Sequence, residues 1–252
     1  MVFSSLLWEP RKNHTDFLSR VAVMPTALTW YRTSYTGIWF RCFESDCDVQ
    51  DHPVTMLTRF DSGGFFSLHG HPGGEEILVL QGSFEDEIGV HPPGTYMLNP
   101  EGFIHSPYSS EGCLTFVKLR QHGGKTRDPV RTNIYESPWQ SGMIPQIEVK
   151  PLYQQVGYPE KIWVERWLAG TRLSNIVETE VKEIFVIEGT WNDELGHYPT
   201  GSWLRYPPNC PYSPASETGC LIYVKSYPLD VTRFVVGEDF QHPASKDLTG
   251  MG

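Results

Sequence analysis

The stretch GGFFSLHGHPGGE, residues 63–75, decides both the fold and the chemistry expected of this 252-residue chain. His69 and His71 are two positions apart, so on a β-strand both imidazoles point to the same face. The Pro-Gly-Gly sequence at 72–74 then turns the chain and brings Glu75 in beside them. Two imidazoles and a carboxylate therefore converge within seven residues.

A second stretch, GTYMLNPEGFIH at residues 94–105, supplies a third imidazole. A turn built on Pro100 and Gly102 precedes His105, as the Pro-Gly-Gly turn precedes Glu75. Three imidazoles and one carboxylate on converging strands form a ligand set for a divalent first-row metal. The two stretches together predict a metal site made by His69, His71, Glu75 and His105.

Working outward, the flanking sequence consists of short runs rich in Val, Ile, Phe, Tyr and Thr, separated by Gly, Pro, Asn and Asp. The clearest runs are WFRCF (39–43), VTMLTRF (54–60), FFSLHGH (65–71), EILVLQG (76–82), TYMLN (95–99) and CLTFVKLR (113–120). No run keeps a helical period over three turns. The pattern predicts an all-β chain. Residues 1–25 predict no element clearly, since 16–23 fits either a short helix or an added strand.

The chain then repeats itself. Residues 75–119 match residues 182–226 at a constant offset of 107 without a gap, so that Gly82 meets Gly189 and Cys113 meets Cys220. The repeat predicts two tandem domains, which we place at residues 1–125 and 126–252. Because the two cysteines occupy matching positions, they are interpreted as buried packing residues rather than redox groups.

These motifs resemble those of a known family. Gly63-x5-His69-x-His71-x3-Glu75-x6-Gly82 resembles the first cupin motif, and Gly94-x5-Pro100-x-Gly102-x2-His105 resembles the second, with Ser109 where the usual pattern ends in Asn. The sequence around these motifs is similar to that of the ChrR type of cupin and to that of acetylacetone-dioxygenase-like proteins. The resemblance implies two tandem jelly-roll barrels, each a double-stranded β-helix, in a bicupin.

Applied to the ligands, the offset of 107 places Ile176, Glu178, Lys182 and Tyr212 at the positions of His69, His71, Glu75 and His105. No histidine survives, and the carboxylate has become an ammonium. We therefore expect one divalent metal per chain, in the first barrel, and a degenerate second site. One hypothesis puts the Lys182 ammonium at the vacated position, paired with Glu178 and bonded by Tyr212. The alternative is a surface salt bridge.

Composition narrows the partners. The formal net charge of −10 argues against nucleic acid and anionic membranes. No run of about 18 apolar residues predicts a membrane span, and the N-terminal sequence does not resemble a secretory signal. Five cysteines at wide spacing favour reduced thiols in a cytoplasmic protein. A small-molecule ligand is the expected partner, and the cupin resemblance favours a homodimer.

Two functions follow from the resemblance. The first is an Fe(II)-type dioxygenase, an oxidoreductase acting on a small carbonyl or enol(ate) compound; the second is a non-catalytic metal-binding sensor like the C-terminal domain of ChrR anti-sigma factors. Imidazole and carboxylate ligands suit Fe, Zn, Mn, Ni or Cu, so the ligand set leaves the metal open. Met56, Tyr96 and Phe116 are candidate substrate contacts by strand position, with barrel packing as the alternative. Glu76 should point away from the metal, toward a supporting or surface position, and His91 is interpreted as a turn residue.

Overall fold

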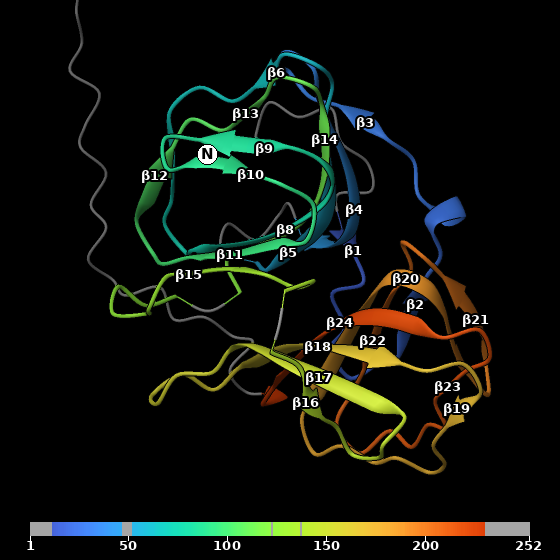
Figure 1. The fold of residues 1–252 in the computed structure, drawn as a ribbon. Helices are drawn as coiled ribbons and strands as arrows, with labels where there is room; N and C mark the ends of the chain where they lie inside the picture. Colours follow the sequence, from blue (N-terminus) through green and yellow to red (C-terminus); the bar gives the residue numbers. More distant parts are fainter. Residues whose placement is uncertain (1–11, 47–51, 122, 137, 230–252) are drawn as a thin grey trace, which may run out of the picture.

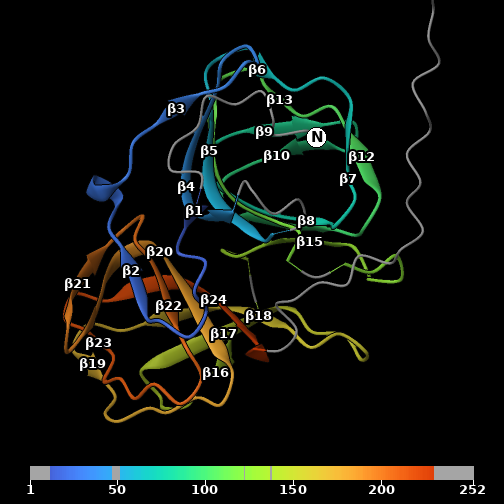
Figure 2. The same cartoon turned by 180° about the vertical axis from the view of Figure 1, so that it is seen from behind.

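The computed structural model describes residues 12–46, 52–121, 123–136 and 138–229. Within these residues the chain is built from β-strands, and the helical content is one 3-10 turn, η2 (Pro25–Ala27). The strands form two barrels that lie side by side in both views (Figures 1 and 2). None of the described helices is long and apolar enough to cross a membrane.

The first barrel has one large sheet that faces two small ones (Figure 1). The large sheet has the order β1-β4-β5-β14-β8-β11-β15, with β3 on β4. Its strands are β1 (Lys12–Asn13), β3 (Tyr31–Arg32), β4 (Ile38–Asp46), β5 (Val54–Phe60), β8 (Glu75–Gly82), β11 (Thr95–Asn99), β14 (Cys113–Leu119) and β15 (Val130–Asn133). The small sheets are β10-β9-β13-β6 and β12-β7. Their strands are β6 (Gly64–Phe65), β7 (His69–His71), β9 (Phe84–Asp86), β10 (Gly89–His91), β12 (Phe103–His105) and β13 (Tyr108–Ser109).

The second barrel repeats this plan in a single connected sheet of order β16-β17-β18-β24-β20-β22-β2, with β19, β21 and β23 attached. Its strands are β2 (Val21–Val23), β16 (Gln140–Ser141), β17 (Ile147–Tyr153), β18 (Lys161–Trp167), β19 (Thr171–Arg172), β20 (Val181–Asp193), β21 (Gly196–Pro199), β22 (Trp203–Tyr206), β23 (Ala215–Ser216) and β24 (Cys220–Tyr227). Two tandem all-β barrels are what the repeat predicts, and the expected fold class is confirmed.

Each sequence run becomes a strand where alternating apolar residues can be buried on the pleat. The run at 65–71 is the exception, because residues 66–68 separate β6 from β7 and the two strands join different sheets. A bulge marks the same place in both copies. The extra residue is Leu80 on β8, opposite the Leu114–Thr115 step of β14, and Ile187 on β20, opposite the Leu221–Ile222 step of β24. The repeat in sequence is therefore a repeat in backbone detail.

The repeat glycine at the end of β8 shows why that position is kept in both copies. Gly82 has φ +67°, and a Cβ there would lie 1.9 Å from the carbonyl oxygen of Gly112. At the matching Gly189, φ is +75° and a Cβ would lie 2.1 Å from the carbonyl oxygen of Gly219. Only glycine fits this close approach of two backbones.

The two barrels exchange a strand. β15 lies in the stretch of sequence expected for the second domain, but it joins the first barrel. There its Arg131 is opposite Met97 of β11. β2 lies in the chain between β1 and β3 of the first barrel, but it pairs with β22 of the second, where Ala22 is opposite Leu204 (Figures 1 and 2). The added strand considered for residues 16–23 is thus present, in the sheet of the other barrel. The boundary after residue 125 stays a prediction.

Between the barrels lies an apolar cluster drawn from both. Phe116 of β14 stacks on Phe185 of β20 with ring centroids 4.3 Å apart, and Phe43 packs edge-on against Phe185. Tyr96 and Tyr223 belong to the same cluster. The interiors of the first and second barrels form two further clusters. The apolar residues between the barrels are therefore buried, as those of the two interiors are.

Reciprocal buried ion pairs cross this interface. Lys118 of the first barrel pairs with Glu183 of the second, and Lys225 of the second pairs with Glu76 of the first. The offset of 107 relates Lys118 to Lys225 and Glu76 to Glu183, so the two pairs are equivalent. All four side chains are at most 4% exposed. Charges removed from water to this extent must be paired, and here each is paired across the interface.

Candidate metal centre

The three histidines come together because β7 and β12 form a two-stranded antiparallel sheet. His105 lies directly opposite His69, and Phe103 lies opposite His71. The turn after β7 returns the chain so that Glu75 begins β8, on the large sheet that faces β7 and β12 (Figures 1 and 2). The local sequence thus delivers two imidazoles from one strand, one from its partner and a carboxylate from across the barrel.

The donor atoms lie close to one another. One nitrogen from each of the three imidazoles lies within 4.8 Å of the other two. His71 Nε2 is 3.0 Å from His105 Nε2, and each of these nitrogens is 3.5 Å from Glu75 Oε2. His71 and His105 are buried, and His69 is partly open to solvent. Among the described residues, this is the one such group of three metal-ligating side chains.

A neighbouring acceptor sets the direction of the His69 imidazole, and a carboxylate lies behind that of His105. His69 Nδ1 is 2.8 Å from the carbonyl oxygen of Ser67, an acceptor, so that Nδ1 donates and Nε2 keeps its lone pair toward the cluster. His105 Nδ1 faces Asp86 Oδ2 at 3.9 Å, beyond hydrogen-bond length, and its Nε2 is likewise directed at the cluster. Asp86 is fixed in turn by His91, whose Nε2 is 2.9 Å from Oδ1.

Burial favours the neutral forms of His69 and His71, whereas contacts with histidines favour the ionised form of Asp86. Burial lowers the pKa of His71 well below its usual range, and the neighbouring His105 and His69 add to this. The pKa of His69 is also lowered, mainly by burial. Burial raises the pKa of Glu75, against the opposing effect of His105. Burial also acts to raise the pKa of Asp86, but its contacts with His105 and His91 lower it on balance.

These donors fit a divalent ion. At a metal–nitrogen length of about 2.1 Å, neighbouring ligand atoms are about 3.0 Å apart in an octahedral shell and about 3.4 Å apart in a tetrahedral one. The separations of 3.0 and 3.5 Å among His71, His105 and Glu75 span these values. Without an ion, two imidazole nitrogens 3.0 Å apart would have to share a single proton. Neutral imidazoles with free lone pairs are the form that a metal binds.

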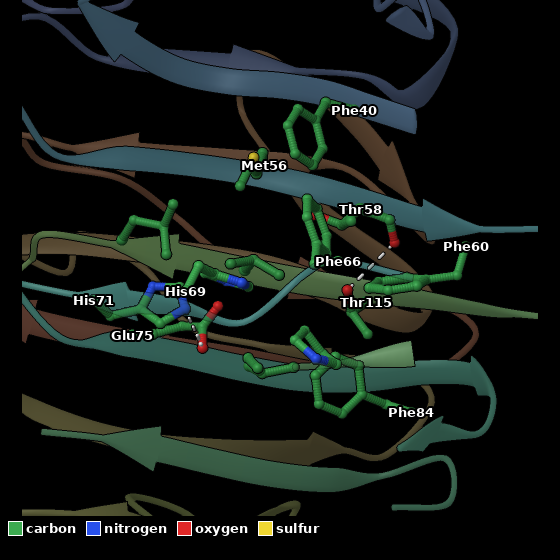
Figure 3. Close-up of a pocket in the computed structure, with 14 residues that line it drawn as sticks. Phe40, Met56, Thr58, Phe60, Phe66, His69, His71, Glu75, Phe84 and Thr115 are labelled. Carbon is green, nitrogen blue, oxygen red and sulfur yellow. Dashed lines mark hydrogen bonds and ion pairs between the residues drawn. The ribbon is translucent and has the colours of Figure 1, made fainter. Parts of the chain in front are cut away.

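A cavity runs from the cluster into the interior of the first barrel (Figure 3). Figure 3 shows His69, His71 and Glu75 at one end and the rings of Phe60 and Phe84 toward the other. The space open to the centre of a water molecule is about 30 Å³, room for about two waters. The wall is mainly aromatic and aliphatic, and the lining residues are Phe40, Met56, Thr58, Phe60, Phe66, His69, His71, Glu75, Ile77, Phe84, Pro107, Thr115, Val117 and Leu119.

Of the three candidate substrate contacts, Met56 lines this cavity. Tyr96 and Phe116 do not: the structure places both in the apolar cluster between the barrels, on the opposite face of the large sheet. Both faces of β11 and β14 are buried, so alternation alone does not identify the inward one. On β14, the residues that line the cavity are the neighbours of Phe116, which are Thr115 and Val117.

Glu76 points away from the cluster, but its carboxylate is in the interface rather than at the surface. It accepts hydrogen bonds from Tyr223 at 2.8 Å and Tyr96 at 3.3 Å and pairs with Lys225. Burial acts to raise the pKa of Glu76, and the Lys225 charge lowers it on balance. Adjacent residues on β8 therefore belong to the histidine cluster and to the interface between the barrels.

Two supporting residues were not predicted from the sequence. Asn99 Nδ2 donates to Glu75 Oε2 at 3.1 Å, and Asp86 lies behind His105. The run at 85–87 recurs in the second copy as a hairpin feature, and Asp86 does bind the hairpin amide of Ile88 at 2.9 Å. Its position behind His105 could not be predicted by comparing the two copies. His91, interpreted as a turn residue, is buried against Asp86.

Ser109, which departs from the cupin pattern, has the same contact in both copies. Its hydroxyl donates to the carbonyl oxygen of Ser83 at 2.6 Å, and the matching Ser216 donates to that of Thr190 at 2.7 Å. The departure therefore affects the small sheet rather than the histidine cluster.

In the second barrel, the replaced positions meet in the same register. Ile176 and Tyr212 form an antiparallel bridge, as His69 and His105 do in the first. Lys182 Nζ is 3.2 Å from Glu178 Oε1 and 5.9 Å from the Tyr212 ring centroid. The Lys182 side chain is 12% exposed. Burial acts to lower its pKa, but its interactions with Glu165, Tyr212 and Glu178 raise it on balance.

Two β-barrels with a three-histidine cluster in one of them define the class: a tandem cupin with the donors of a metal centre. A family model, the ChrR cupin-like domain, matches residues 18–123 and again 127–230. The chain belongs to this family. No curated protein sequence matches it.

Solved structures with the same fold are distant in sequence. A candidate dioxygenase of Nostoc punctiforme is 11% identical, with a TM-score of 0.72 over 86% of this chain and 85% of that one. The pirin YhhW of Escherichia coli, solved with nickel(II), is 14% identical, with a TM-score of 0.63 over 83% of this chain and 99% of that one. Salicylate 1,2-dioxygenase of Pseudoaminobacter salicylatoxidans is 12% identical, with a TM-score of 0.55 over 70% of each chain. These likenesses establish the fold.

Proposed function

We propose that this protein is a metal-dependent dioxygenase that acts on a small carbonyl or enol(ate) compound, with one divalent ion held by His69, His71, Glu75 and His105. The observation that carries the proposal is that the histidine cluster opens onto an apolar cavity. A bound ion there would supply Lewis acidity and a template for a substrate oxygen, and a redox-active ion such as Fe(II) would also activate dioxygen.

The chain's own residues select the substrate. None of the described residues that line the cavity is a lysine or an arginine. A second carboxylate or a phosphate on the substrate would therefore be buried without a counter-charge, which is costly. The Phe40, Phe66 and Met56 side chains exclude water and favour a short apolar group. These features favour a small ketone or diketone, in keeping with the dioxygenases among the structural neighbours.

The size of the cavity favours a second candidate, a non-catalytic metal-binding sensor of the ChrR type. Space for about two waters suits dioxygen or a peroxide better than an organic substrate, unless the aromatic wall moves. The two candidates differ in two measurable respects, which are the identity of the metal and the consumption of dioxygen in the presence of a ketone.

The test is elemental analysis of anaerobically purified protein, followed by oxygen uptake with β-diketones and hydroxy-ketones. The dioxygenase predicts about one iron per chain and ketone-dependent uptake. Tight zinc without uptake would favour the sensor. His71→Ala should remove the metal, whereas the exposed His197 of the second barrel provides a matched control in His197→Ala. Stoichiometric metal retained in His71→Ala would contradict the ligand assignment.

A further inference from the structure

A chain of directed hydrogen bonds leads from the strand β15 to the Glu75 carboxylate. Arg131 Nη2 donates to Asn99 Oδ1, and Asn99 Nδ2 donates to Glu75 Oε2 at 3.1 Å. Arg131 Nη1 also donates to the carbonyl oxygens of Val130 at 2.7 Å and Leu98 at 3.2 Å, which fixes the guanidinium on the end of β11. Asn99 is 1% exposed, so its amide is shielded from bulk water.

Each link has one direction. A guanidinium can only donate hydrogen bonds, so the Asn99 oxygen must face Arg131 and the Asn99 amino group must face Glu75. The amino group in turn can only donate, so it takes one lone pair of Glu75 Oε2. The same oxygen is 3.5 Å from His71 Nε2 and from His105 Nε2. Its second lone pair is therefore presented to the space between the two imidazoles.

We propose that Asn99 and Arg131 are positioning residues of the metal centre, which act by fixing the direction of the Glu75 ligand oxygen. This inference rests on the proposed function only in requiring that the cluster binds a metal. Partners of this kind that orient a ligand typically contribute 10–100-fold to metal affinity.

The second barrel provides an internal comparison. At the position of Asn99 it has Tyr206 by the offset of 107, and opposite Leu204, where the first barrel has Arg131, β2 has Ala22. Both members of the pair are therefore absent from the copy that lacks the histidines. By contrast, Asp86 has an equivalent in Asp193, which binds the same hairpin amides. The Asn99–Arg131 pair accompanies the ligands, whereas residues that serve the fold occur in both copies.

Arg131 also reaches the cluster by an unusual route. It lies on β15, which follows the first barrel in sequence and precedes the second. The orientation of a ligand in the first barrel thus depends on the segment that joins the two barrels. The expected metal site is assembled from β7, β8 and β12, and its supporting residues come from β11 and β15.

The experiment is a Co(II) titration of EDTA-treated protein, which measures the dissociation constant and the visible d–d spectrum of the bound ion. Arg131→Met and Asn99→Ala remove the donors, Arg131→Lys keeps a cationic donor, and Arg172→Met removes an exposed arginine that pairs with Glu217 at 3.2 Å. We expect Arg131→Met and Asn99→Ala to bind Co(II) about 10–100-fold more weakly with a shifted spectrum. Arg131→Lys should recover part of the loss, and Arg172→Met should match the wild type.

Two results would overturn the inference, and they are distinguishable. Wild-type protein that binds one Co(II) together with an Arg131→Met variant of equal affinity and spectrum would remove the positioning role and leave the proposed function intact. Wild-type protein that binds no Co(II) would remove both. Arg131 is only half-buried, so Arg131→Met supplies the measurement even if Asn99→Ala does not fold.

Discussion

Replacing Lys118 by Met should destabilise the protein in a manner that depends on pH. Lys118 Nζ donates to Thr55 Oγ1 at 2.7 Å and pairs with Glu183, and its side chain is fully buried. The substitution fills the same space but leaves Glu183 without its counter-charge in a buried interface. Glu183 must then either remain ionised and unpaired, at about 3–5 kcal/mol, or take up a proton. Whichever of these two states has the lower free energy determines the loss of stability.

The cost of protonation can be worked out. With an ordinary glutamate pKa of about 4.3 and about 1.36 kcal/mol per pH unit, protonating Glu183 costs about 3.7 kcal/mol at pH 7 and about 1 kcal/mol at pH 5. In the wild type, burial acts to raise the pKa of Glu183, but Lys118 lowers it on balance, so this group stabilises the fold above its unfolded pKa. Without Lys118 the folded pKa rises above the unfolded one, and the sign reverses: destabilisation grows as the pH rises.

Urea denaturation followed by tryptophan fluorescence at pH 5 and pH 7 measures both values. At pH 7 the loss corresponds to a fall in melting temperature of roughly 7–15 °C for a chain of this size. The double variant Lys118→Met, Glu183→Gln should recover most of the loss and its pH dependence. Arg166→Met, which breaks an exposed pair with Glu148, should cost about 1 kcal/mol or less. Equal losses at the two pH values would refute the reasoning.

Three further measurements test other features. Gly82→Ala should cost more than about 3 kcal/mol by urea denaturation, because its Cβ would meet a backbone oxygen, whereas Gly63→Ala, with φ +76° and open space around the Cβ, should cost only about 1–2 kcal/mol; similar losses would contradict the clash. Metal-free protein should lose stability as the pH falls below about 6.5, because the lowered pKa of His71 means that the unfolded chain binds protons first. Urea denaturation midpoints that do not fall between pH 7.5 and pH 5.5 would contradict this expectation. Burial raises the pKa of Cys113 to about 12 and that of Cys220 to about 11, so mass spectrometry should find both unlabelled by N-ethylmaleimide in native protein and labelled in urea, and rapid native labelling would show that they are exposed.

Local sequence was sufficient for much of this architecture. Runs of β-forming residues between turn residues located the long strands β5, β8, β11 and β14 within one residue, but short strands such as β9, β10 and β13 had no predicted run. The spacing of His69, His71 and Glu75 indicated a cluster because strand geometry and one turn determine their relative positions. The offset between the copies revealed the second barrel. In each case the information lies within about ten residues, or in a comparison of two such stretches.

What the sequence did not reveal depends on contacts between distant segments. β2 and β15 are too short to specify a partner, so their exchange between the barrels could not be derived from their composition. Phe116 and Glu76 lie on strands that are buried on both faces, where alternation does not distinguish the inside of a barrel from an interface. The role of Asn99 depends on Arg131 arriving from another strand.

The reciprocal pairs Lys118–Glu183 and Lys225–Glu76 have the symmetry of a contact between two identical subunits, in which one patch meets its own copy. In a homodimer every mutation appears on both sides at once, so a ligand lost from one subunit is lost from its mate. Joining the two units into one polypeptide removes that constraint. One half can then have Ile176 and Tyr212 where the other has His69 and His105, while it keeps the buried lysine and glutamate that pair with the other half.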